Sequence, residues 1–225
     1  MNTETLVLGG WACPPSILKP LFGDCRYIDI NYYATRLIES GSLMYNWPEK
    51  LIDAMDPPCG AITTLVGWST GAIMALGLAP ILHPSRTILL SATRSFCRRD
   101  DFRFGMPEKM VRGMIQGLKS DREKTLGQFF RNCGFKPPYP DTTAYTTQQL
   151  SDGLVLLTQI SLPLSDLCHY DEPPLLLHGK DDRIIPCKAG EKLGEQLKAP
   201  FKCFQGGHAF FLEENAIEEI SNLNT

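Results

Sequence analysis

The sequence Gly-Trp-Ser-Thr-Gly at positions 67–71 carries the strongest chemical signal in the chain. It follows a β-rich run, residues 62–66, and opens a stretch of small residues, which is the strand–turn–helix arrangement that a nucleophilic serine requires. So tight a turn leaves no room for side chains at its two glycines, and it pushes the serine hydroxyl out above the edge of a sheet. The helix N-terminus beside it favours negative charge. Ser69 is therefore predicted to be a nucleophile.

A serine hydroxyl needs a base to take its proton, and the base needs an orienting acid. His208 lies in a glycine-rich loop between the last predicted strand and the last predicted helix, so it is the predicted base. His178 ends its own strand and is expected to be a buried structural residue near the site. The acid is expected in the following loop, where Asp181 and Asp182 compete. We favour Asp182 because it lies four residues before Pro186, which begins a helix.

The tetrahedral intermediate of such chemistry needs two hydrogen-bond donors for its oxyanion. One is expected to be the main-chain N–H of Thr70, immediately after the nucleophile. The other is expected to be the N–H of Trp11, in the loop after the first strand, where the paired glycines at positions 9–10 let the main chain approach a substrate. Trp11 is also a candidate wall of the acyl pocket.

These groups need a sheet that brings them to one edge, and the sequence predicts one. Short apolar runs alternate with helical stretches, a pattern typical of a mostly parallel sheet with helices on both faces. Strands are expected at residues 6–8, 26–30, 61–66, 87–90, 175–177 and 201–204, with core helices at 71–82, 188–198 and 213–223. The candidate loops then meet at one end of the sheet.

The alternation breaks between residues 94 and 168, where no strand is expected and three charged helical stretches occur at 107–118, 122–132 and 146–160. We predict a core formed by residues 1–93 and 169–225, with residues 94–168 inserted before the last strands as a helical cap. A separate helical domain is the alternative. The return of the chain to the sheet at Leu175 favours the cap.

Composition excludes several function classes. The chain has 225 residues and a net charge of −3, so it has no overall basic field to bind nucleic acid or an anionic membrane. No apolar run is long enough to span a membrane, and the first residues lack the features of a signal peptide. The eight cysteines are scattered and expected to be reduced, and no cluster has the spacing of a metal site. We expect a cytoplasmic monomer with no metal and no cofactor.

Short segments along nearly the whole chain match one known family: 10–11, 67–71, 91–97, 124–129, 153–154, 166–167, 177–179, 182–186 and 208–209. The sequence resembles the α/β-hydrolase superfamily, and within it the esterases that cleave the methyl ester of pimeloyl-acyl-carrier protein in biotin synthesis. The resemblance implies an α/β-hydrolase fold and a carboxylesterase that acts through an acyl-enzyme. The chain starts directly at its first strand, so the antiparallel hairpin that often opens this fold is expected to be short or absent.

The resemblance also implies roles for residues of the cap. Phe129 would line the acyl pocket, and Lys124 would stand where the family places an arginine that binds the acyl-carrier protein. Three positions depart from the family pattern: Gly9 stands in place of a histidine, Thr70 in place of a common leucine, and Gln128 in place of a further basic residue. The substrate depends on these positions, whereas the fold and the three catalytic candidates do not.

Two other functions stay open from the sequence. A lyase of the menaquinone-pathway type would use the same three residues as a base, and Arg94, Arg98 and Arg99 could then clamp a polycarboxylate. A binding or receptor protein would keep the pocket with little turnover, although such a protein needs no oriented base. The implied partners are therefore a small acyl ester and, through the resemblance, an acyl-carrier protein.

Overall fold

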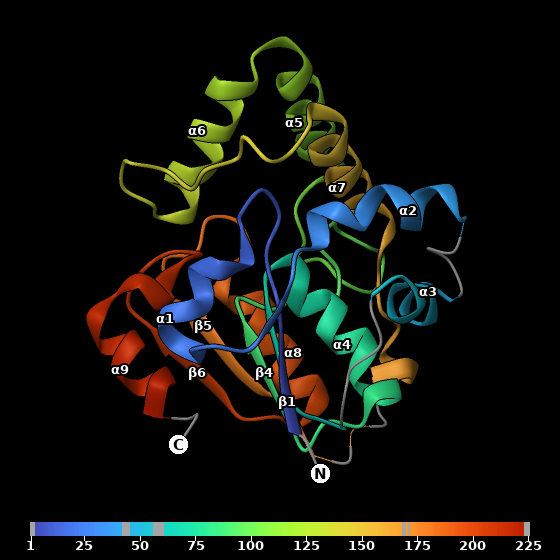
Figure 1. Ribbon diagram of the computed structural model, residues 1–225, viewed down its shortest axis with the longest axis vertical. Coiled ribbons are helices and arrows are strands. Elements are labelled where there is room, and N and C mark those ends of the chain that lie inside the picture. Colours follow the sequence, from blue (N-terminus) through green and yellow to red (C-terminus); the bar gives the residue numbers. More distant parts are fainter. Residues whose placement is uncertain (1–2, 42–45, 56–60, 168–169, 171, 223–225) are drawn as a thin grey trace.

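A parallel β-sheet forms the centre of the computed structural model, which describes residues 3–41, 46–55, 61–167, 170 and 172–222 (Figure 1). Its strands are β1 (Thr3–Leu8), β2 (Arg26–Ile28), β3 (Ala61–Trp68), β4 (Arg86–Leu90), β5 (Leu175–Gly179) and β6 (Phe201–Phe204). The strand order is β2-β1-β3-β4-β5-β6, and every pairing is parallel. Runs such as Leu-Leu-Leu in β5 suit a sheet that helices cover on both faces. The predicted fold class is confirmed.

The strand order changes direction at β1, and that point positions the site. The chain passes from β1 to β2 in one direction across the sheet, whereas β3, β4, β5 and β6 follow one another in the other. The loops that leave β1 and β3 therefore diverge, and ligands of open parallel sheets bind in the crevice between such loops. Leu8 pairs with Gly67, so the loop at Gly9 and the turn at Ser69 start side by side.

The core helices lie between consecutive strands, except the last, which follows β6. They are α1 (Lys19–Phe22), α2 (Ala34–Glu39), α3 (Trp47–Ala54), α4 (Thr70–Leu82), α8 (Cys187–Leu197) and α9 (Glu214–Asn222), with short 3-10 turns at Pro15–Leu18, Ile30–Tyr32, Leu164–Leu167 and Phe210–Leu212. Crossovers between parallel strands are right-handed, so α4 and α8 cover one face and α1 covers the other. Figure 1 shows α1 and α9 on one side of the sheet and α4 on the opposite side.

Three helices, α5 (Glu108–Ser120), α6 (Arg122–Cys133) and α7 (Thr147–Gln159), lie between β4 and β5 in the chain and above the sheet in Figure 1. They occupy the segment predicted as a cap. Its two ends are joined, because Leu162 N–H donates to Arg94 O at 2.9 Å and the Arg94 guanidinium donates to Leu162 O at 3.1 Å. The division at residues 94–168 stays a prediction, since residues 168 and 169 lie outside the described part of the chain.

Not every element was expected. The helices α1, α2 and α3 were missed because they are short and lack a long apolar period. The strand expected at 26–30 ends at Ile28, since Asp29 begins a 3-10 turn by accepting a hydrogen bond from Asn31 N–H. Cysteines at positions 13, 25, 97, 133, 187 and 203 are free thiols, and Cys59 and Cys168 lie outside the described residues. Across the described ranges, no helix is both long and apolar enough to cross a membrane.

Candidate active site

Ser69 lies in a sharp turn between β3 and α4 and carries backbone strain. Its φ of 59° and ψ of −117° are uncommon for a residue with a side chain. The turn can be this tight because a Cβ at Gly71 would overlap the carbonyl oxygen of Leu8 and lie 2.6 Å from that of Gly9. The Ser69 N–H donates to Leu90 O at 3.0 Å, which fixes the turn to β4. The hydroxyl is thereby held at the N-terminus of α4, at the carboxyl edge of the sheet.

His208 bridges the serine and a carboxylate. Its Nε2 lies 2.7 Å from Ser69 Oγ, and its Nδ1 lies 2.7 Å from Asp182 Oδ2. The main chain of His208 is also fixed, because its carbonyl oxygen accepts hydrogen bonds from the Trp68 indole at 3.1 Å and the Ser91 hydroxyl at 3.0 Å. The side chains of Ser69, His208 and Asp182 are all buried. The structure thus brings together the three residues that the sequence singled out as nucleophile, base and acid.

Each carboxylate oxygen of Asp182 faces two nitrogen donors. Oδ1 accepts the main-chain N–H groups of Ile184 at 2.8 Å and Ile185 at 2.9 Å. Oδ2 faces His208 and also lies 3.1 Å from His178 Nε2. That Nε2 lies 2.9 Å from Ile185 O as well, so it must carry its proton, because both neighbours are acceptors. His178 is therefore a second donor that holds the carboxylate, a role that the sequence did not reveal beyond predicting a buried histidine nearby.

The environment keeps Asp182 ionised. Burial by itself raises the pKa of this carboxyl, but the charge of His208 and hydrogen bonds from His178 and His208 outweigh burial and hold the pKa well below its usual range. The competing Asp181 is exposed and lies outside this network. Only Asp182 of the two contacts the imidazole, so the geometry favours the carboxylate that the sequence analysis chose.

The loop after β1 is held in shape by Asn31, which the sequence analysis did not single out. Asn31 is buried; its Oδ1 accepts the Ala12 N–H at 2.9 Å, and its Nδ2 donates to Gly10 O at 3.3 Å and to Asp29 Oδ1 at 2.7 Å. Ala12 has a φ of 56°, so the loop turns sharply there. One amide side chain thus fixes the main chain on both sides of Trp11. No sequence pattern marks an asparagine for this task.

The two expected oxyanion donors have free N–H groups. In the part of the chain that the structure describes, no protein acceptor binds the main-chain N–H of Trp11 or of Thr70. Thr70 begins α4 directly after the nucleophile, and the positive end of the helix favours an anion there. The geometry leaves both groups available to a substrate.

The side chain of Trp11 reaches up to the cap. Its indole Nε1 donates to Leu150 O in α7 at 2.8 Å, and its ring packs edge-on against Phe129 of α6 with centroids 4.6 Å apart. A second link joins the same two regions, because the Tyr145 hydroxyl donates to Asp29 Oδ2 at 2.5 Å. Burial raises the pKa of Asp29, although the hydrogen bonds that its carboxylate accepts from Tyr145 and Asn31 partly oppose this rise.

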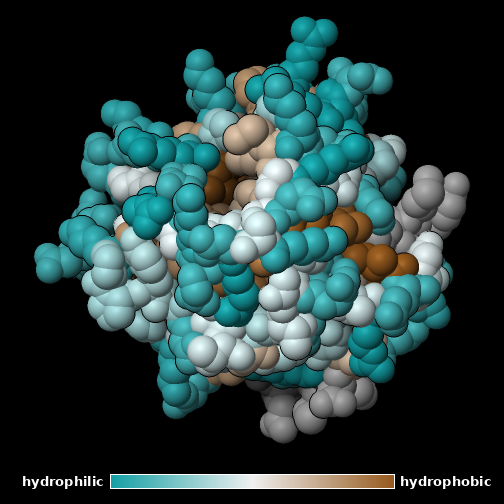
Figure 2. Space-filling model, turned by 90° about the horizontal axis from the view of Figure 1, so that it is seen from above, coloured by the Kyte–Doolittle hydropathy of each residue, from teal (hydrophilic) through white to brown (hydrophobic). Residues whose placement is uncertain are grey.

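A small cavity of about 20 Å³ lies beside the serine. It is lined by Ser69, Thr70, Trp11 and Phe129 together with Phe96, Met106, Met114, Leu154, Leu157 and Ile184. Phe129, which the resemblance assigns to the acyl pocket, thus lies at this cavity together with Leu154 and Leu157, and its role stays a prediction. Leu126 and Phe130 line a different pocket, between α6 and residues 139–143. Figure 2 looks down on the cap side and shows a largely hydrophilic surface with a hollow whose floor is apolar.

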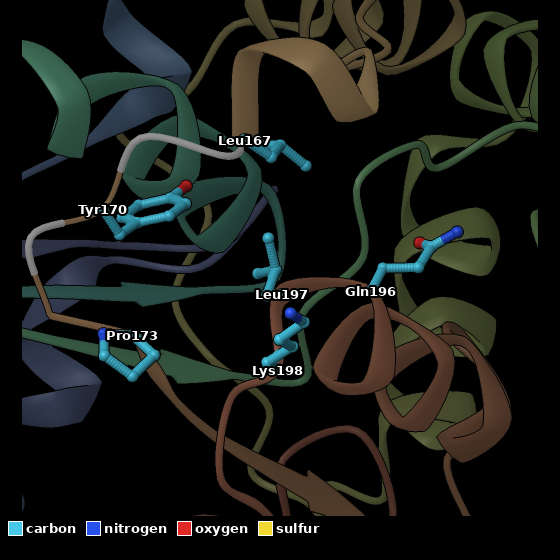
Figure 3. Close-up of a pocket in the computed structure, with 6 residues that line it drawn as sticks. All are labelled: Leu167, Tyr170, Pro173, Gln196, Leu197 and Lys198. Carbon is cyan, nitrogen blue, oxygen red and sulfur yellow. The ribbon is translucent and has the colours of Figure 1, made fainter.

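A larger pocket of about 330 Å³ lies far from these residues (Figure 3). Its lining includes Pro173 and Lys198, which precede β5 and β6 respectively. It therefore opens at the amino edge of the sheet, opposite Ser69, and Figure 3 shows the Gln196 side chain pointing away from its centre. Among the described residues, no group of three or more His, Cys, Asp or Glu side chains could hold a metal ion.

Comparisons with known proteins agree with this architecture. A model of the alpha/beta hydrolase family matches residues 28–223. The chain is 26% identical over 180 residues to a pimeloyl-[acyl-carrier protein] methyl ester esterase from Nitrosospira multiformis, a match that covers 71% of this chain and 64% of that protein. It is 30% identical over 173 residues to the protein of the same name from Nitrosomonas europaea, with 66% and 65% covered. These matches span less than two thirds of both relatives.

A solved structure is similar over nearly the whole chain. The esterase from Exiguobacterium antarcticum superposes with a TM-score of 0.71 at 20% identity, covering 99% of this chain and 91% of that one. At this level of identity the likeness concerns the fold, and one fold can carry many activities.

Proposed function

The chain belongs to the alpha/beta hydrolase family, and from this membership we propose that it is a serine carboxylesterase. Ser69 is the nucleophile, His208 the general base and Asp182 the acid that orients the imidazole. The single observation that carries the proposal is the buried chain of two 2.7 Å hydrogen bonds that runs from Ser69 Oγ through His208 to Asp182.

Each step of ester hydrolysis then falls to a named group. Ser69 Oγ attacks the ester carbonyl carbon while its proton passes to His208 Nε2, and Asp182 stabilises the imidazolium. The N–H groups of Trp11 and Thr70 bind the oxyanion. His208 next protonates the departing alcohol, and water hydrolyses the acyl-enzyme by the same steps.

We further propose that the substrate is the methyl ester of an acyl chain borne by an acyl-carrier protein. The names of the relatives support this class, and the apolar lining around Ser69 suits an acyl chain. Because the cavity holds only about 20 Å³, an acyl chain must displace side chains of the cap that line it, such as Phe129. The cap, residues 94–168, is then the part that measures the chain beyond the ester group.

The charge on the cap supports an acidic partner. Helices α5 and α6, residues 108–133, contain six basic and three acidic side chains, although the whole chain has a net charge of −3. Lys119 and Lys124 are exposed, and within the described ranges no acceptor binds their ammonium groups. Arg122 differs, because its guanidinium donates to Thr142 O and Tyr145 O and so supports the cap itself.

The lyase alternative receives no support from the arginines that would serve it. Arg94 is buried and donates to Leu162 O and to Asp101. Arg98 and Arg99 donate to the carbonyl oxygens of Gly105 and Thr158. None of the three arginines lines the cavity beside Ser69, where a clamp for a polycarboxylate would have to lie.

The test is a search for the acyl-enzyme. Incubation with p-nitrophenyl butyrate should add one butyryl group to the protein, seen by mass spectrometry on the peptide that contains Ser69. Ser69→Ala should remove both the adduct and turnover, because loss of a triad nucleophile lowers kcat by roughly 10⁴- to 10⁶-fold. Turnover in Ser69→Ala within about tenfold of the wild type would overturn the esterase mechanism.

The carrier-protein proposal has its own test. Lys119→Glu combined with Lys124→Glu should lower kcat/KM for a carrier-protein-linked ester at about 0.01 M salt, and the loss should shrink at about 0.1 M salt because the charges are then screened. A free methyl ester should be unaffected. Lys50→Glu with Lys198→Glu, which changes the net charge equally on exposed residues outside the cap, is the control. If the double variant lowers kcat/KM equally for both substrates, or for neither, the carrier-protein proposal fails and the protein is a hydrolase of small esters.

A further inference from the structure

The hydroxyl of Thr70 is a buried polar group for which the described part of the chain offers no hydrogen-bond partner. Thr70 is 1% exposed, and its Oγ1 is shielded from solvent. An unpaired hydroxyl in a protein interior costs roughly 1–3 kcal/mol relative to a paired one. Such groups are uncommon in folded proteins, so this one calls for an explanation.

The local structure makes no use of this hydroxyl. Ser69 is the N-cap residue of α4, and the helix has no side-chain cap. Valine has the same shape as threonine and would fill the position without an unpaired polar group. Thr70 also lines the cavity beside Ser69, so this residue borders the space that the reacting ester enters. The position and the missing partner both indicate a ligand as the acceptor.

We propose that the Thr70 hydroxyl is a third donor to the oxyanion, beside the main-chain N–H groups of Thr70 and Trp11. This inference rests on the proposed esterase function. The hydroxyl and the N–H belong to one residue, so both can approach the same oxygen of an acyl group on Ser69. The surrounding side chains are apolar, and a hydrogen bond to a developing negative charge is strongest in such a low-dielectric site.

The proposal predicts opposite effects on activity and stability. Thr70→Val should lower kcat by roughly 10- to 100-fold with KM changed less than about threefold, because the lost bond forms only as the oxyanion develops. The same variant should unfold at a temperature equal to or above that of the wild type, since it removes an unpaired buried hydroxyl. Thr70→Ser retains a hydroxyl and should recover most of the lost kcat.

A second threonine supplies the matched control. Thr93 is also 1% exposed, but its hydroxyl donates to Ser95 O at 2.8 Å. Thr93→Val should therefore lower the unfolding temperature and leave kcat near that of the wild type. If the Thr70 hydroxyl had only a structural role, Thr70→Val would behave like Thr93→Val, with a lower unfolding temperature and a kcat near that of the wild type.

The experiment compares the wild type, Ser69→Ala and the Thr70 and Thr93 variants on a short acyl ester. It also measures inhibition by a trifluoromethyl ketone, which forms an oxyanion on Ser69, against the matching methyl ketone. We expect Thr70→Val to weaken the trifluoromethyl ketone selectively. If the wild type is active through Ser69 but Thr70→Val matches Thr70→Ser in kcat and inhibition, this inference alone fails. If Ser69→Ala keeps its activity, the proposed function fails and the inference with it.

Discussion

Replacing Asp182 by asparagine is the most incisive test of the site, because this carboxylate has four donors and an amide can accept from only one side. Oδ1 accepts from Ile184 N–H and Ile185 N–H, and Oδ2 faces His208 Nδ1 and His178 Nε2. Asparagine keeps one carbonyl oxygen and introduces an NH₂ group in place of the other oxygen. Two of the four donors must then face another donor.

The main-chain N–H groups of Ile184 and Ile185 determine the orientation of the asparagine amide in Asp182→Asn. With its oxygen toward the two main-chain N–H groups, the NH₂ group faces His208, which can pair with it only by leaving Nδ1 unprotonated. The proton then sits on Nε2, where it blocks the transfer from Ser69. In the opposite orientation, the NH₂ group faces the two main-chain N–H groups, and each buried donor left without an acceptor costs roughly 1–3 kcal/mol.

The expected loss of kcat follows from the His208 tautomer that carries its proton on Nε2. An asparagine at the acid position of a well-studied protease triad lowers kcat by about 10⁴, which corresponds to about 5.4 kcal/mol of transition-state stabilisation at 25 °C. We expect a similar loss for Asp182→Asn on p-nitrophenyl butyrate, together with a lower unfolding temperature. Asp181→Asn is the control, because Asp181 is exposed and should leave kcat within about threefold of the wild type.

The assay is steady-state hydrolysis by both variants at the same pH, with circular dichroism to show that each is folded. A loss below about tenfold for Asp182→Asn, or a greater loss for Asp181→Asn, would show that the 2.7 Å contact to His208 does not orient the base.

Three further predictions concern the frame of the site. Gly71→Ala should unfold the chain or sharply lower its thermal stability in calorimetry, because the added Cβ would overlap the carbonyl oxygen of Leu8; normal stability would mean that the turn is looser than described. The pKa of Asp182 is lowered in the fold, so its stabilisation is complete above the carboxyl's unfolded pKa and is lost as the pH falls toward its folded value. Urea titrations at about pH 6 and about pH 3 should show a greater loss for the wild type than for Asp182→Asn, and equal losses would contradict the ionised assignment. Trp11→Phe removes the bond to Leu150 O, so it should raise the rate of hydrogen exchange in α7, and unchanged exchange would show that the indole does not hold the helix.

The sequence was sufficient for the features that depend on local pattern. All six strands were expected within a few residues, because buried apolar runs bounded by glycine, proline and charged residues are a local signal. The elbow at Ser69 was equally visible, since its glycines are required by contacts within a few residues and with the adjacent strand β1. The chemical roles of Ser69, His208 and Asp182 stay predictions, although the structure places the three side chains in hydrogen-bond contact.

Contacts between residues far apart in the chain could not be predicted from the sequence. Asn31 fixes the loop around Trp11 through bonds that no periodicity or motif encodes. His178 was expected only as a buried residue, because its second acceptor, Asp182, becomes apparent only once the loop is folded back over β5. The unpaired hydroxyl of Thr70 could not be inferred either, since a missing partner can be recognised only after the surroundings of a side chain are known.

The bond between the Trp11 indole and Leu150 O bears on how the cap can move. An outward movement of α7 must either break this bond or pull the Trp11 side chain along with it, and it must likewise break the Tyr145–Asp29 bond or pull on Asp29. The Asn31 amide holds the main chain on both sides of Trp11 separately, so the loop keeps its own anchor when the indole bond breaks. The two bonds to the cap therefore resist its opening, whereas the shape of the loop beneath it depends on the core.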